Sequence, residues 1–196
     1  MHPVNEGEHG IVELEIRRFE SGLKADFERL MDGDEGCSWC RCVAWWVPSW
    51  VGFGDRSEAD NRQLREELLE RGEYDGYLAY RDEQCVGWCQ VGPRDRLPKL
   101  AREHELAPDS TSFAITCFYV PEDERRRGVS RALLRGVLAD LDARSVKRIE
   151  AFPRSEGALA SGELWTGPRS LFAENGFCEQ EAGGRRILMV RELPAR

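Results

Sequence analysis

The stretch YVPEDERRRGVSRALL, residues 119–134, joins a strongly strand-like run to an amphipathic helix. Residues 113–120 are rich in β-branched and aromatic side chains up to Pro121, and from Val129 apolar side chains recur at helical spacing. The first amides of a helix have no internal partner, and the helix dipole there favours an anion. Because Gly128 lacks a side chain, a phosphate can approach the backbone closely. The stretch therefore predicts a pyrophosphate site.

The arginines of this turn, Arg125, Arg126, Arg127 and Arg131, support the same prediction. A cation at a helix N-terminus is unfavourable by about 0.3–1 kcal/mol. A cluster of cations at this position would therefore be unfavourable unless an anion bound there, which favours the pyrophosphate site. The alternative is that these are ordinary surface arginines on the first turn of an amphipathic helix.

Composition indicates a single globular unit of 196 residues, of which 41% are hydrophobic and 33% charged. The net charge of −8 disfavours nucleic acid and anionic membranes as partners. It fits a cationic small partner or simply an acidic soluble surface. The polar start of the chain predicts no signal peptide, and no segment is apolar for long enough to span a membrane. Seven scattered cysteines complete the prediction of a cytoplasmic protein with mostly reduced thiols.

Strand and helix patterns alternate along the chain. Strands are predicted over residues 11–19, 76–80, 85–91, 113–120 and 146–152, from 177 onward, and over 187–193. Helices are predicted over residues 23–31, between the N-cap Ser57 and Gly72, and over 97–106, 129–141 and 168–174. Residues 81–84 and 183–184 predict turns, and Gly92-Pro93 should end the strand before it. A helix that crosses over between the strands at 113 and 146 implies an α/β fold with one parallel pair.

The same turn resembles the acetyl-CoA signature of the GNAT superfamily of N-acetyltransferases, Q/R-x-x-G-x-G/A. Residues 125–130, RRRGVS, fit it except at Ser130, which is small like the usual glycine or alanine. Residues 171–177, LFAENGF, resemble the late helix of the family and its closing Gly-Phe. Residues 87–91, GWCQV, resemble its third strand. The resemblance covers about residues 75 to 193.

This resemblance implies an α/β (α+β) fold with a mixed, mostly antiparallel central sheet, a splayed parallel strand pair and flanking helices. It implies a single acyltransferase domain over 1–196, with an N-terminal part at 10–72 and a cofactor-binding core at 73–193. The family is often dimeric, so a homodimer is a further expectation. The implied activity is transfer of an acetyl group from acetyl-CoA, as co-substrate, to a primary amine of a small molecule by direct attack.

The family binds the cofactor arm between its fourth and fifth strands, as a false strand would bind. Carried over, the cofactor contacts are Phe118, Tyr119, Val120, Arg125, Arg126, Arg127, Gly128, Val129, Ser130 and Arg131. The first three would contact the arm through their backbone, and the rest would hold the pyrophosphate.

Catalytic groups are less evident in the sequence. A free alkylamine has a pKa of about 10, so the acceptor must lose a proton. The leaving thiolate must be stabilised or protonated. The family often supplies a tyrosine four residues before the glycine of Gly-Phe, but here that position is Phe172. Tyr119 is the remaining candidate acid, unless the thiolate leaves unassisted. Glu150 is the candidate base, directly or through water, and the alternative is an ordinary strand carboxylate. The asparagine that commonly precedes the late helix would fall near Trp165.

A second motif is GCSWCRCVAWW, residues 36–46. A structural zinc site needs four ligands, and Cys37, Cys40 and Cys42 offer three. Cys85 or Cys89 could supply a fourth only if the hairpin folds over, so no metal is expected. The preferred interpretation is an aromatic wall beside the acceptor, built by Trp39, Trp45, Trp46 and Trp50, with the cysteines packed as small hydrophobes. Ordinary core packing is the alternative. Asp34 and Glu35 could steer a cationic acceptor. Two other functions stay open: a catalytically idle CoA-binding or regulatory module, and a zinc or thiol protein.

Overall fold

The computed structural model describes residues 14–33, 39–154, 164–180 and 187–193. Its centre is a seven-stranded sheet with the order β1-β2-β3-β4-β5-β7-β6. Within the described residues, neighbouring strands run antiparallel except β4 and β5, which run parallel. The strands are β1 Glu15–Arg18, β2 Gly76–Arg81, β3 Gln84–Pro93, β4 Ser112–Tyr119, β5 Arg148–Ala151, β6 Cys178–Gln180 and β7 Leu188–Glu192. The predicted mixed sheet with one parallel pair is confirmed.

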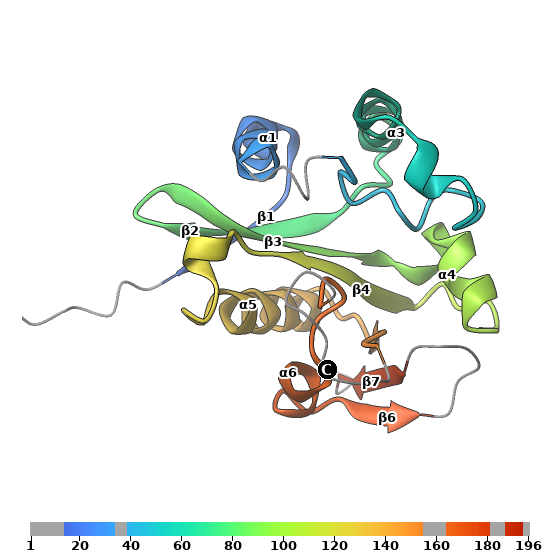
Figure 1. The fold of residues 1–196 in the computed structure, drawn as a ribbon. Helices are drawn as coiled ribbons and strands as arrows, with labels where there is room; N and C mark the ends of the chain where they lie inside the picture. Colours follow the sequence, from blue (N-terminus) through green and yellow to red (C-terminus); the bar gives the residue numbers. More distant parts are fainter. Residues whose placement is uncertain (1–13, 34–38, 155–163, 181–186, 194–196) are drawn as a thin grey trace, which may run out of the picture.

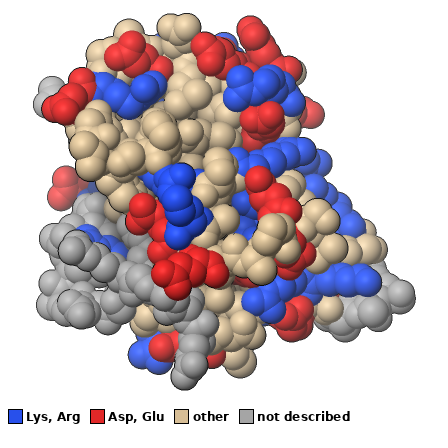
Figure 2. All heavy atoms as spheres, turned by 90° about the vertical axis from the view of Figure 1, so that its right-hand side faces the viewer, with Lys and Arg blue, Asp and Glu red and all other residues tan. Residues whose placement is uncertain are grey.

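Helices cover both faces of this sheet (Figure 1). One face carries α1 and α3, the other carries α5 and α6, and α4 lies at one end of the sheet. The helices are α1 Lys24–Asp32, α3 Glu58–Glu70, α4 Pro98–Glu103, α5 Val129–Ala143 and α6 Arg169–Ala173. Short 3-10 turns occur at Ser21–Leu23, Phe53–Asp55, Arg94–Arg96 and Glu122–Glu124. On the side of the molecule that Figure 2 shows, positive and negative side chains are interspersed, so the net charge does not gather there into one acidic field.

Local sequence rules account for several of these boundaries. The Ser57 hydroxyl accepts from the Asp60 amide and the Asp60 carboxylate accepts from the Ser57 amide, which is the capping box that starts α3. Asp82 and Glu83 have φ of 48° and 64°, as the tight β2–β3 hairpin requires. One prediction is wrong: β3 continues through Gly92 to Pro93 instead of stopping before them. Proline is tolerated there because it is the last residue of the strand. The predicted turn at 183–184 lies outside the described residues.

β4 carries a one-residue bulge at the point where its parallel pairing with β5 ends. In the β3–β4 ladder, Gln90 pairs with Cys117 but Val91 pairs with Ile115, so Thr116 is the extra residue. The β4–β5 ladder covers Ser112 to Ile115 and stops at the same point. Beyond the bulge β4 continues to Tyr119 without β5 beside it. This geometry is the splayed parallel pair that the sequence predicted.

The two sheet faces bury separate apolar clusters. On the α5 side, Leu133, Val137 and Leu141 pack with residues of β3, β4 and β5. On the α1 side, Phe27 and Trp88 pack edge to face with ring centroids 4.8 Å apart. Trp88 is fully buried and lies against Gly76 of β2. A Cβ at Gly76 would lie 2.1 Å from the Trp88 ring, which leaves no room for any other residue.

Replacing Gly76 with alanine is therefore expected to lower the free energy of unfolding by about 1–3 kcal/mol through overpacking. Gly54→Ala is the matched control, because a Cβ at Gly54 meets nothing within 4 Å. The control should change stability by no more than about 0.5 kcal/mol. Urea unfolding of both variants tests this, and equal midpoints would contradict the packing argument.

Candidate active site

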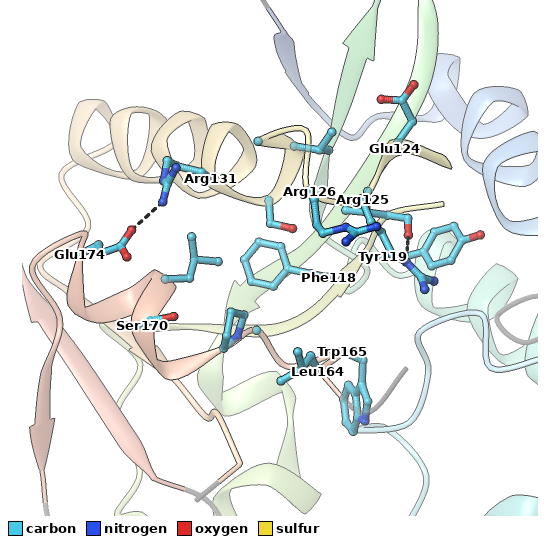
Figure 3. A pocket seen from close by; sticks show the side chains of 17 residues that line it. Phe118, Tyr119, Glu124, Arg125, Arg126, Arg131, Leu164, Trp165, Ser170 and Glu174 are labelled. Atoms are coloured by element: carbon cyan, nitrogen blue, oxygen red, sulfur yellow. Dashed lines mark hydrogen bonds and ion pairs between the residues drawn. The ribbon is translucent and has the colours of Figure 1, made fainter. Parts of the chain in front are cut away.

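A cavity of about 430 Å³ opens where β4 has parted from β5 (Figure 3). Its floor is the end of β4, Phe118 to Val120. One wall is the turn and first residues of α5, from Glu124 to Arg131, and the other is residues 164–174 with α6. The cavity therefore lies across the exposed start of α5, at the place where the sequence predicted an anion site.

The structure brings the predicted cofactor contacts together with one exception. Lining the cavity are Phe118, Tyr119, Val120, Arg125, Arg126, Gly128, Val129, Ser130 and Arg131. Arg127 does not line it, and its guanidinium pairs with Glu124 at 3.0 Å. Sequence reasoning missed the opposite wall, which includes Leu164, Trp165, Gly167, Pro168, Ser170 and Glu174. The Gly-Pro pair before α6 was the available signal, since it marks a turn that delivers the chain to a helix.

The N-terminus of α5 is uncapped by any side chain. Gly128 is its N-cap and has a φ of 84°, in the left-handed region that favours glycine. The first helical hydrogen bond runs from the Ala132 amide to the Gly128 carbonyl at 2.9 Å. The amides of Val129, Ser130 and Arg131 therefore have no carbonyl of their own helix to bind. Nothing lies within 4 Å of where a Gly128 Cβ would stand, so this backbone is open to a ligand.

The arginines around the cavity differ in how they are compensated. Arg131 pairs with Glu174 across the cavity wall at 2.8 Å, and Glu124 pairs with both Arg81 and Arg127. Arg126 forms no ion pair with any residue that the structure describes, and its side chain points into the cavity in Figure 3. The expectation that this whole arginine cluster needs an external anion is therefore corrected, because acids of the fold balance part of it.

The backbone of Phe118 already has a partner. Its amide donates to the Trp165 carbonyl at 2.6 Å, so the chain itself occupies one of the positions predicted for the cofactor arm. The Trp165 ring in turn contacts Trp45 and Trp50, with ring centroids 6.0 and 6.5 Å away. Trp165 thus connects the cavity to the aromatic loop at 39–50.

Tyr119 and Phe118 point to opposite faces of the sheet, as neighbours on a strand do (Figure 3). Tyr119 packs in the cluster on the α1 side, with Tyr80 and Trp88. Phe118 packs on the α5 side, against Phe172 at 6.2 Å between ring centroids. Phe172 is buried, so the position where the family often has a tyrosine is here part of the core. An acid role for Tyr119 stays a prediction.

Glu150 lies away from this cavity. It is buried on β5, where its carboxylate accepts from Arg94 at 3.2 Å and from Arg148 at 2.9 Å. Arg94 also donates to the Ala107 carbonyl, so the ion pair links β5 to the segment around α4. A buried carboxylate that bonds two guanidinium groups is structural in character. The base role predicted for Glu150 gains no support from this placement.

The cysteine loop is mainly core. Cys42 lies 3.4 Å from Cys117, sulfur to sulfur, and this contact together with burial raises the pKa of the Cys42 thiol. Burial raises the pKa of Cys40 to about 12. Among the described residues no group of side chains could hold a metal ion, and Cys37, Asp34 and Glu35 lie outside them.

The tryptophans of this loop do not line the cavity. Trp45 is buried, Trp46 stacks on Tyr74, and Trp39 packs on Phe53. Trp39 and Trp46 are half-buried, and Trp50 is the most exposed of these four tryptophans, at 37%. Of the two interpretations of the loop, core packing describes most of it, and only Trp165, from another segment, forms cavity wall.

Comparison with known proteins bears on this site. A family model described as "Acetyltransferase (GNAT) family" matches residues 39–165, more than half of the chain. The structure resembles a PaiA N-acetyltransferase from Thermoplasma acidophilum in complex with coenzyme A, with 12% identity, a TM-score of 0.55 and coverage of 92% of this chain and 99% of that one. It also resembles the YncA protein of Salmonella typhimurium with its cofactor acetyl-CoA, with 16% identity, a TM-score of 0.56 and coverage of 92% and 94%.

A third similar structure is a ribosomal-protein-alanine N-acetyltransferase from Brucella melitensis, with 18% identity, a TM-score of 0.55 and coverage of 91% and 99%. At these identities the likeness concerns the fold. A search of curated proteins finds no significant sequence match. No helix in the described ranges is both long and apolar enough to cross a membrane.

The placement of Glu150 leads to a stability prediction. Glu150→Gln should lower the free energy of unfolding by about 3 kcal/mol, because it removes the carboxylate that pairs with the buried Arg94 and one of the two that pair with Arg148. Glu192→Gln is the control, since Glu192 also pairs with Arg148 but is exposed, and it should cost no more than about 1 kcal/mol. Chemical denaturation of both variants measures the difference. A Glu150→Gln protein as stable as the control would contradict the structural role.

Proposed function

Because this chain belongs to the acetyltransferase (GNAT) family, we propose that it transfers the acetyl group of acetyl-CoA to a primary amine of a small molecule. The observation that carries the proposal is the coincidence of three features in one cavity. These are the parting of β4 from β5, the uncapped N-terminus of α5, and the uncompensated guanidinium of Arg126. Together they suit an elongated ligand with a doubly charged diphosphate at one end.

The cofactor would lie with its diphosphate on the amides of Val129, Ser130 and Arg131, beside Arg126. Its pantetheine arm would run along β4 beyond the end of the β4–β5 ladder and bind the backbone there, as an added strand does. For that the Trp165 carbonyl must release the Phe118 amide, so binding exchanges one main-chain hydrogen bond for another. A volume of about 430 Å³ is within the ordinary range of cofactor and ligand sites.

The chemistry proposed is direct. The neutral amine nitrogen attacks the thioester carbonyl, the C–S bond breaks, and the nitrogen proton is passed on as the thiolate leaves. A main-chain amide near Val120 is suited to bind the carbonyl oxygen as it gains negative charge. Since Phe172 has no proton to give, most of the rate would come from holding amine and thioester in line.

An idle cofactor-binding module is the second candidate, and the observation that favours it is Phe172, which stands where the family often has a tyrosine. The two differ in one measurement. The protein is incubated with acetyl-CoA and a panel of amines that includes amino acids, polyamines and a peptide amino terminus. An active enzyme releases free coenzyme A thiol at a rate that rises with the concentration of its acceptor amine. An idle module binds acetyl-CoA saturably but releases no free thiol with any amine of the panel.

Two neighbouring arginines test the cofactor site. Arg126→Ala is expected to weaken coenzyme A binding about tenfold, since one charge-assisted hydrogen bond to a phosphate is worth roughly 1.5–3 kcal/mol. Arg127→Ala, outside the cavity and 58% exposed, should change affinity by less than about twofold. Isothermal titration calorimetry measures both. Equal losses of affinity in the two variants would show a general effect of charge and contradict the proposed diphosphate site.

Gly128→Glu is a stronger test of the same diphosphate site. The carboxylate would stand in the open space over the α5 amides and repel a diphosphate, so coenzyme A binding should be abolished. Circular dichroism and urea unfolding check that the variant remains folded. A folded variant with unchanged affinity would contradict the proposal.

A further inference from the structure

Lys99 is a buried lysine whose amine has no hydrogen-bond partner among the described residues. The residue lies on α4 and is 1% exposed. Its Nζ is surrounded by aromatic rings, at 3.5 Å from the Trp50 ring centroid, 5.3 Å from that of Phe53 and 5.7 Å from that of Trp45. Cation–π attraction partly compensates a buried ammonium, but an amine without a hydrogen-bond acceptor is unusual in a core.

This aromatic box is joined to the cavity. Trp45 and Trp50 both contact Trp165, and Trp165 lines the cavity beside Phe118 of β4. The cover of the box is a surface turn: Trp50 is 37% exposed, and Val51 is 90% exposed. Gly52 follows with a φ of 76°, so the turn is held by a residue with unusual backbone freedom. Trp50 is the ring nearest to Nζ and contacts Trp165, so transfer from the cavity to Nζ requires these two rings to move aside.

The electrostatics of the box favour the neutral amine. Burial, with a smaller contribution from Arg102, lowers the pKa of Lys99 to about 8. The opposing groups are Glu103 on the same helix and Cys40 in the loop, both of which raise the pKa. At pH 8 about half of such an amine is neutral, against about 1 part in 250 for a lysine with a pKa near 10.4. Attack on a thioester requires the neutral form.

We propose that Lys99 is an acetyl acceptor within the chain itself, so that the protein acetylates its own α4 from acetyl-CoA bound in the cavity. In this step Nζ attacks the thioester carbonyl, the new N–C bond replaces the C–S bond, and the proton lost by nitrogen passes to the coenzyme A thiolate. The product is Nε-acetyl-lysine and free coenzyme A. The inference rests on the proposed function, because it needs the same bound thioester.

The lysine content of the chain makes the test clean. Besides Lys99 there are only Lys24, which pairs with Glu66, and Lys147, which is exposed. Wild-type protein is incubated with acetyl-CoA at pH 8 and digested, and acetylation is mapped by mass spectrometry. Lys99 should be modified at least about tenfold faster than Lys24 and Lys147. Its rate should rise with a midpoint near pH 8, as the ammonium loses its proton.

Two variants separate catalysed transfer from simple reactivity. Gly128→Glu should lose the Lys99 modification, whereas chemical acetylation of a reactive amine would continue in it. Trp50→Ala should admit water to the aromatic box and move the midpoint of the pH profile toward that of an ordinary lysine. Coenzyme A binding is measured on the same samples. Binding without modification of Lys99, or equal modification in Gly128→Glu, overturns the inference alone. Absence of binding by the wild-type chain overturns it together with the proposed function.

Discussion

The single extra residue at Thr116 is the constraint on which the site depends. A parallel pair of strands normally stays hydrogen-bonded along its length, and a cavity between them leaves backbone groups to be satisfied. Here the bulge ends the β4–β5 ladder at Ile115. The Thr116 hydroxyl donates to Gln90, whose amide donates to the Cys42 carbonyl, so the distortion is anchored to β3 and to the loop on the α1 side. At the edge of β4 that results, the Trp165 carbonyl binds the Phe118 amide.

The second requirement is a site that binds a negatively charged group. Main-chain amides contribute more to this site than side chains do. Arg131 and Arg127 have acidic partners within the fold, so their charges are balanced before any ligand arrives. What remains directed at the cavity is the group of free amides at the start of α5 and the guanidinium of Arg126. Because amides in a helix are fixed, they bind a diphosphate without the loss of side-chain entropy that a flexible arginine would suffer. A glycine at the N-cap is the condition for this approach.

Much of the fold could be predicted because it follows from local rules, and the site only where it is built from one contiguous stretch. The strand ending at Pro121 and the helix from Val129 carry their own periodicity, and the nine cavity residues found by motif are all within 118–131. Contacts between distant segments could not be predicted. No pattern in the sequence indicates that Glu150 meets Arg94, or that Trp165 supplies the opposite wall of the cavity. A bulge leaves no signature either, since Thr116 is an ordinary strand residue. These features depend on tertiary packing, which short-range patterns do not record.

Amide hydrogen exchange with and without coenzyme A tests the central claim most directly, because it observes the backbone that is said to bind. On saturation with coenzyme A, exchange should slow at Val129, Ser130 and Arg131 and along the end of β4, while β1 and β2, on the far side of the sheet order, stay unchanged. If the cofactor binds and these amides exchange as before, the α5 amides are not the diphosphate seat and the account of the cavity is wrong.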